Sequence, residues 1–221
     1  MRKIVLSVVT AISSVLISPF AGCKKNEPTA PNVSQIRYDV FYAEDVRFKI
    51  SVFAEKRESP FIADGNPAPL SPFVLVKLTP KTEENAENAD ITAKIKTNEK
   101  TYSAVFDFKP VSTARECRLY PEKPLSGGFA LTLTVNGEKF VYEPKSLKNK
   151  AIITYSAAIF DVKKYAKGRL DRYFSEDTGE IRVKLVENDG FNYWLVEFID
   201  ETATVSFLVD ARTGEVINEL R

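Results

Sequence analysis

Apolar and polar residues alternate along much of the chain between residues 36 and 142. The clearest run is 46–52, where an apolar side chain occupies every second position. Because successive side chains of a strand point to opposite faces, this spacing predicts a strand with one buried face. Similar patterns, bounded by Pro, Gly, Asn or charged residues, predict further strands at 36–42, 73–78, 91–97, 101–108, 131–135 and 139–142.

The last two of these strands flank Asn136-Gly137, a pair that tolerates the positive φ of a tight hairpin turn. About seven strands separated by short turns, with no long amphipathic helix between them, indicate an antiparallel β-sandwich. In size and strand spacing, residues 36–150 resemble an immunoglobulin-like (Ig-like) or fibronectin-type domain. The resemblance is architectural, because the segment lacks a Cys–Trp–Cys core pattern.

A different periodicity begins at Ala151. Apolar residues then recur every three or four positions, which predicts an amphipathic helix that Ser156 caps at its N-terminus. Strands are predicted to follow at 180–186, 193–199 and 202–209, with a short closing strand at 215–218. The whole chain is therefore expected to be mainly β, with a small α+β domain of one helix on an antiparallel sheet at its end. The predicted buried positions of the helix are Ile159, Val162, Ala166, Leu170, Tyr173 and Phe174.

The end of the chain resembles PepSY-like domains. The resemblance lies in 194–198 and 205–217, and most sharply in the sequence Asp-Ala-Arg-Thr-Gly-Glu-Val at 210–216. In that family a helix precedes an antiparallel sheet, and a turn of this kind closes the last hairpin. Asp210 and Thr213 can bond turn amides, and Gly214 accepts a positive φ. The resemblance implies an extracytoplasmic module associated with peptidase propeptides, regulation and protein contacts, without catalytic residues to carry over.

The first residues are typical of a secretory signal. Arg2 and Lys3 precede a nearly continuous apolar run at 4–17, which is shorter than the roughly 20 residues of a transmembrane helix. The sequence Phe20-Ala21-Gly22-Cys23 resembles the lipobox of bacterial lipoproteins, with Phe20 in place of the usual leucine. The resemblance implies cleavage before Cys23 and a lipid on that cysteine. An ordinary cleaved signal with an unmodified Cys23 and an uncleaved anchor are the alternatives.

These features divide the chain into four parts. We expect a lipoprotein signal peptide at 1–22, the lipidated Cys23 with a polar tether at 23–35, the Ig-like β-sandwich at 36–150 and the PepSY-like domain at 151–221. A tether of this length reaches at most roughly 40 Å when extended. The protein is thus predicted to be extracytoplasmic and lipid-anchored to a bacterial membrane, at the outer membrane or the cell surface, with the folded part close to the bilayer.

Composition excludes several classes of function. The chain has no histidine, which excludes histidine-dependent catalytic triads and ordinary zinc sites. Its 31 Lys and Arg against 30 Asp and Glu give no basic surplus for nucleic-acid binding. Nucleotide-binding loops and nucleophile motifs are absent from the sequence. We therefore expect that the protein is not an enzyme and has no cofactor or metal site. We interpret the acidic segment at 83–90 as a solvated loop and Cys117 as an unreactive, half-buried residue.

Candidate binding residues are aromatic or apolar side chains near predicted loops. The loop 59–72 carries Phe61 and Ile62 among four prolines, which pre-stiffen it at the end of the sandwich. Tyr193 and Trp194 are candidates on a strand, where core packing is the competing interpretation of Trp194.

Two hypotheses of function follow. The first is a non-catalytic interaction or adaptor module that contacts an envelope protein partner. The alternative is a surface lipoprotein that binds a glycan or peptide through exposed aromatic side chains. Glycosidase chemistry needs only two carboxylates, for which Glu187, Asp189 and Glu197 are the candidates, and it is the least favoured interpretation.

Overall fold

The computed structural model describes residues 32–60, 62, 64, 67–81, 90–109, 114–148, 151–175, 178–201 and 203–220. The described chain is mainly β, as the alternating pattern predicts. Its elements follow in the order β1 (Val33–Glu44), β2 (Phe48–Arg57), β3 (Ser71–Pro80), β4 (Ile91–Lys96), β5 (Thr101–Val105), β6 (Asp107–Lys109), β7 (Ala114–Leu119), β8 (Ala130–Val135), β9 (Glu138–Tyr142), β10 (Lys145–Ser146), α1 (Tyr155–Tyr173), β11 (Glu180–Asn188), β12 (Phe191–Ile199), β13 (Thr204–Asp210) and β14 (Val216–Leu220).

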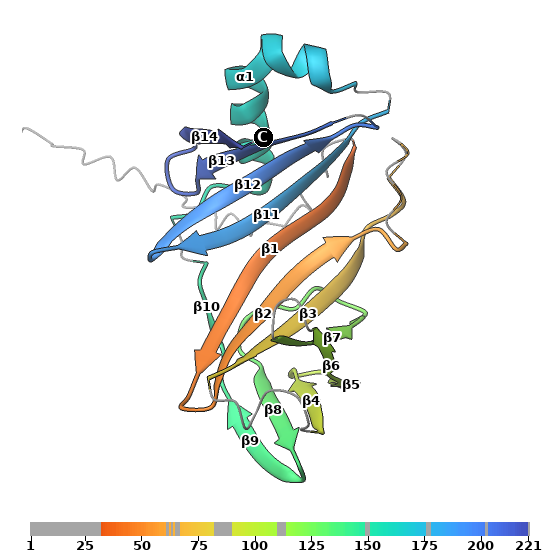
Figure 1. Ribbon diagram of the computed structural model, residues 1–221, viewed down its shortest axis with the longest axis vertical. Coiled ribbons are helices and arrows are strands. Elements are labelled where there is room, and N and C mark those ends of the chain that lie inside the picture. Colours follow the sequence, from red (N-terminus) through yellow and green to blue (C-terminus); the bar gives the residue numbers. More distant parts are fainter. Residues whose placement is uncertain are drawn as a thin grey trace, which may run out of the picture.

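A long mixed sheet runs through the molecule in the strand order β14-β13-β12-β11-β1-β2-β3-β7-β6 (Figure 1). Neighbouring strands along this path are antiparallel except β1 and β11, which pair in parallel through residues 33–37 and 181–184. The short strand β10 pairs with the second half of β1. The parallel pair was not predicted, because a contact between segments so far apart in sequence leaves no local pattern. The domain division proposed from the sequence stays a prediction.

A second, antiparallel sheet has the order β5-β4-β8-β9 in the described residues. Its β8–β9 hairpin turns at Asn136 and Gly137, whose φ angles of 49° and 88° confirm the turn predicted from the sequence. The predicted strand 101–108 is two strands, because the chain leaves the second sheet at the buried Phe106 and joins β7 of the long sheet.

Each end of the long sheet has its own hydrophobic core. The first core lies between the β1–β2–β3–β7 part and the second sheet, and the second lies under α1, which contacts β12, β13 and β14. Both cores lie on the same face of the long sheet. Ile36 of the second core pairs with Lys56 on β2, and paired residues share a face. Lys56 is two residues from Ala54 of the first core, and residues two apart on a strand also share a face. Tyr38 packs against both clusters, at a bulge of β1 between Arg37 and Asp39.

The helix α1 begins earlier than the sequence predicts. Thr154, not Ser156, is its N-cap, and the Thr154 side chain accepts a hydrogen bond from the backbone N–H of Ala157. The prediction of Ser156 as the cap was wrong, since the two hydroxyl residues are only two positions apart and both suit a cap. The apolar spacing is confirmed by the burial of Ile159, Val162, Ala166 and Leu170.

Two of the described strands, β7 and the two-residue β10, were missed. In β7, charged residues at 115, 116 and 118 obscure the apolar pattern, although Ala114, Cys117 and Leu119 are buried in the structure. Arg115 is itself buried, with its guanidinium 5.7 Å from the centre of the Phe108 ring. A buried arginine on a strand breaks the apolar–polar alternation on which the prediction depends.

Candidate functional site

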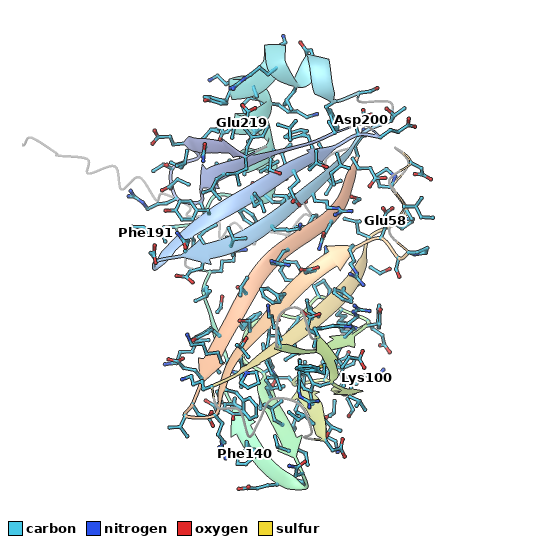
Figure 2. All side chains as sticks on the ribbon, viewed as in Figure 1. Glu58, Lys100, Phe140, Phe191, Asp200 and Glu219 are labelled. Atoms are coloured by element: carbon cyan, nitrogen blue, oxygen red, sulfur yellow. The ribbon has the colours of Figure 1, made fainter. Side chains whose placement is uncertain are left out.

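The connection between β2 and β3 is the segment that combines an exposed apolar residue with buried charge. Its described residues are 58–60, 62, 64 and 67–70. Ile62 has 57% of its surface exposed, whereas Leu70 packs against the core under α1. Figure 2 shows Glu58 where β2 runs into this segment, which we call the anchored loop (residues 58–70).

Two buried carboxylates hold the anchored loop. Glu58 accepts a hydrogen bond from the backbone N–H of Ala68 at 2.8 Å, and Glu180 at the start of β11 accepts one from the N–H of Asp64 at 3.0 Å. Glu58 and Glu180 are only 3% and 0% exposed. The backbone N–H of Glu58 also donates to the carbonyl of Ser34 in β1. The side chains of Glu58, directly after β2, and of Glu180 in β11 therefore hold the anchored loop at Ala68 and Asp64.

The second oxygens of these carboxylates, Oε1 of Glu58 and Oε2 of Glu180, are buried without a hydrogen-bond partner in the described part of the structure. The charges of Glu197, Glu180 and Glu58 all act on Arg182, but burial outweighs them and lowers the pKa of its guanidinium. Buried charge of this kind is tolerated where opposite charges compensate it. The side chains thus form an ionic cluster beneath the anchored loop.

The cluster continues over the sheet face opposite the cores. Glu55, 2% exposed, accepts hydrogen bonds from Arg37 at 2.7 Å and from Gln35 at 2.6 Å. On the neighbouring strands Lys184 pairs with Glu197 at 2.5 Å. Because these carboxylates are bound to cations or amides, the arrangement favours a structural role in holding strands and loop together over proton transfer.

Of the carboxylates considered for glycosidase chemistry, Glu197 is not brought together with Glu187 or with Asp189 of the β11–β12 turn. Glu187 and Asn192 are paired across β11 and β12, and Glu197 lies five residues further along β12. At about 3.3 Å per residue this places Glu187 and Glu197 roughly 16 Å apart, beyond the roughly 5–10 Å that hydrolysis of a glycoside requires. Glu187 accepts a hydrogen bond from the N–H of Gly190 in the turn.

The two aromatic candidates of β12 differ in exposure. Trp194 is 1% exposed, packs in the core under α1 and donates from its indole N–H to the carbonyl of Ile153 at 3.1 Å. The hypothesis of Trp194 as a binding surface is therefore corrected in favour of core packing. Tyr193 is half-buried on the opposite face, at the end of β12 away from Arg182 and the anchored loop.

Of the remaining candidates, Ile62 lies exposed on the anchored loop, while Phe61 and Cys23 lie outside the described residues. The structure does not bring Ile62 and Tyr193 together, since Tyr193 is near the β11–β12 turn and Ile62 is at the other end of these strands. Glu58, Glu180 and Arg182 were missed as site residues. Their only sequence signal is a charged residue at a strand end, which is common on solvated surfaces.

One hollow lies on the second sheet. It has a volume of about 580 Å³ and is lined by polar and apolar groups, among them Thr97, Asn98 and Phe129. A smaller hollow of about 180 Å³ shares Thr97 and Asn98 with it and adds the ring of Tyr102. Polar groups beside an aromatic ring suit a sugar or a peptide.

Metal and membrane-spanning features were also considered. Within the described ranges, no group of three or more Cys, Asp or Glu side chains is arranged to hold a metal ion. The acidic residues at 83, 84 and 87 lie outside those ranges. Among the described residues, no helix is both long and apolar enough to cross a membrane.

Comparisons with known proteins add little. No family model matches the chain, and no curated protein matches it. Among solved structures, the chain is similar to one from Clostridium difficile 630 described as a candidate lipoprotein, with 14% identity and a TM-score of 0.26. The similarity covers 60% of this chain and 82% of that one. A match of this quality carries no argument about function.

Proposed function

We propose that this protein is a non-catalytic, lipid-anchored interaction protein of the bacterial cell envelope that contacts a protein partner through the anchored loop. The observation that carries the proposal is that buried Glu58 and Glu180 fix a loop on which Ile62 is 57% exposed. A loop held in one conformation loses little entropy on binding, so an exposed apolar residue on it suits a specific partner. In this proposal the lipid is attached to Cys23.

The C-terminal part is best interpreted as PepSY-like. Support comes from α1 laid over antiparallel strands and from the turn after β13, where Asp210 accepts hydrogen bonds from the N–H groups of Arg212 and Thr213, both at 2.8 Å. Gly214 has a φ of 81°, and a side chain there would collide with Asp161 of α1. An Ig-like arrangement is proposed for the N-terminal part, whose two sheets enclose the first core.

The partner is tested by cross-linking in native envelopes. We compare the full lipoprotein with the variant Ile62→Asp and with the matched control Val46→Asp, in which the replaced side chain is 82% exposed at the β1–β2 turn. A cross-linked partner lost with Ile62→Asp and retained with Val46→Asp supports the proposal. A partner captured equally by all three proteins contradicts the role of the anchored loop.

The lipid anchor is tested separately. The variant Cys23→Ala should lose fatty-acid labelling and move from the membrane to the soluble fraction, because several acyl chains on one residue hold a protein far more firmly than a single chain. Retention on the membrane without labelling would support an uncleaved anchor instead.

Glycan or peptide binding is the second candidate function, and the hollow beside Tyr102 favours it. On this hypothesis, Tyr102→Ala should abolish binding in a glycan and peptide screen, whereas Ile62→Asp should leave it unchanged. Absence of any bound glycan or peptide would remove this alternative.

A further inference from the structure

The outer side of α1 carries large aromatic side chains in solvent. Phe160 is 66% exposed and Tyr165 is 56% exposed, while the buried face of the same helix is formed by smaller apolar residues. Lys163, Lys164 and Lys167 follow Phe160 at spacings of three, four and seven residues. Residues at these spacings lie on one side of a helix, so an exposed ring and three ammonium groups share one surface.

This surface is basic while the protein as a whole is not. The helix has five Lys or Arg and two Asp, a net charge of +3, whereas the entire chain has a net charge of +1. Arg169 is engaged with Glu219 of β14, and the side chains of Lys164 and Lys167 are exposed. We call Phe160, Lys163, Lys164 and Lys167 the basic helix face.

A hollow of about 250 Å³ lies along the basic helix face. Lys163 and Lys167 line it together with Asp171, and Leu170 and Phe174 give it an apolar part. Ammonium groups beside a small apolar recess suit a phosphate headgroup together with the first carbons of its lipid.

The predicted anchor point joins the chain at the end of the molecule that carries this helix. Val33, the first residue of β1, is 3% exposed and belongs to the core cluster that also contains Ala158 and Ile159 of α1. In Figure 1, β1 starts at the end of the long sheet that carries α1. Cys23 is ten residues before Val33 in the sequence, a length that spans at most roughly 36 Å. A lipid on Cys23 therefore keeps the α1 end of the molecule near the bilayer.

We propose that the basic helix face of α1 docks on the anionic headgroups of the membrane that holds the lipid anchor. Lysines bind such a surface by charge, and an exposed aromatic ring inserts at the level of the headgroups. The proposal rests on the proposed function for the nearness of the membrane, since the lipid on Cys23 supplies it. The bilayer is favoured over an acidic protein because the tether keeps the α1 end of the molecule near the membrane surface.

The test uses the mature chain, residues 23–221, with Cys23→Ser, so that no lipid contributes. Sedimentation with phosphatidylcholine vesicles, with and without phosphatidylglycerol, should show binding only to the anionic vesicles. Raising the ionic strength from about 0.01 M to about 1 M shortens the Debye length from about 30 Å to about 3 Å and should release the protein.

A charge-matched pair of variants assigns the surface. Lys163→Glu, Lys164→Glu and Lys167→Glu together should weaken binding by at least about 10-fold, since each basic residue near the surface contributes several-fold in affinity. The control combines Lys94→Glu, Lys96→Glu and Lys139→Glu, three exposed lysines of the second sheet. It makes the same change in net charge and should keep the affinity of the parent chain. Phe160→Ala should weaken binding even at low salt.

The outcomes separate this proposal from the lipid anchor. Failure of the parent chain to bind anionic vesicles overturns the proposal and leaves the basic helix face to an acidic protein. An equal loss with the control variant also overturns it, because binding would then follow net charge alone. Fatty-acid labelling of Cys23 is measured independently. If the chain binds vesicles but Cys23 is not labelled, the proposal of a lipid anchor is contradicted and the proposal that the basic helix face docks on the membrane is not.

Discussion

Tyr142 donates its phenolic hydrogen to Oδ2 of Asp45 at 2.9 Å, a bond that joins the β1–β2 turn of the long sheet to the last strand of the second sheet. Asp45 also accepts the backbone N–H groups of Arg47 and Phe48 and the guanidinium of Arg47. The Arg47 guanidinium in turn lies over the Phe140 ring of β9, 3.5 Å from its centre. One carboxylate thus organises the contact between the two sheets at this end.

Replacing Asp45 should change the response to acid. Burial by itself raises the pKa of Asp45, but the hydrogen bonds from Phe48, Arg47 and Tyr142 outweigh it and lower the pKa from 3.8 to about 2. A carboxyl group whose pKa is lowered by folding stabilises the protein fully at a pH above its pKa in the unfolded state. This stabilisation is lost as the pH falls through its pKa in the folded state. Between about pH 5 and pH 2 the free energy of unfolding should therefore fall further in the parent chain than in Asp45→Asn. The difference between the two decreases should be on the order of 2 kcal/mol.

Urea denaturation at several pH values measures this difference. Glu99→Gln is the control, because Glu99 is exposed and solvent screens its ion pair with Lys123. Equal acid sensitivity in the parent chain and Asp45→Asn would show that the carboxylate is not stabilised by this network.

Cys117 should react slowly in the folded protein. It is 2% exposed, and burial, with a smaller contribution from the charge of Asp107, raises the pKa of its thiol from 9.0 to about 12. Since the thiolate is the reactive form, the reactive fraction at neutral pH falls by about 1000-fold. Maleimide labelling should be at least that much slower in the native protein than in urea. Labelling at the rate of the unfolded chain would contradict the buried position.

Fluorescence of Trp194 tests the aromatic-binding alternative. Because its ring is buried and its N–H is bonded to the carbonyl of Ile153, acrylamide should quench the native emission only weakly. Titration with a glycan should leave the emission unchanged even if the hollow beside Tyr102 binds it. Strong quenching by acrylamide would place the ring at the surface and restore Trp194 as a binding residue.

The burial of Trp194 illustrates which features the sequence could predict and which it could not. Local patterns specified most of the strands, the α1 core positions and the Asn136-Gly137 turn, because each depends on neighbours within a few residues. The pairing of β1 with β11 and the meeting of Glu58 with Ala68 depend on the tertiary path of the chain. Alternation assigned Tyr193 and Trp194 to opposite faces but did not identify which face is covered.

Tyr38 should couple the two cores. Its side chain packs against both hydrophobic clusters, and its hydroxyl donates to the carbonyl of Leu125 at 3.1 Å. Trp194 lies in the second core and Cys117 in the first, so fluorescence and thiol labelling report each core separately. In urea both probes should show one transition in the parent chain, and Tyr38→Ala should destabilise both by roughly 3 kcal/mol.

Tyr38→Phe is the conservative control for this experiment, since it keeps the ring and removes only a hydrogen bond worth about 1 kcal/mol. If Tyr38→Ala shifted the transition of one probe and left the other unchanged, the two cores would be independent folding units. Such a result would support the division of the chain near residue 150.

Glu58 should be needed to fix the anchored loop. Glu58→Ala removes the acceptor for the N–H of Ala68, and the cost should be about 1–3 kcal/mol in the free energy of unfolding, together with faster proteolysis within residues 58–70. Glu58→Gln keeps an acceptor oxygen and should lose less, while the exposed Glu122 provides the control Glu122→Ala, whose stability should stay close to that of the parent chain. Limited proteolysis and urea denaturation measure both effects. The buried cluster around Arg182 also depends on the charge of Glu58, so Glu58→Ala should destabilise the protein more than the loss of a single hydrogen bond would. If the anchored loop were cleaved no faster in Glu58→Ala than in the parent chain, Glu180 and the packing of Leu70 would suffice to hold the loop.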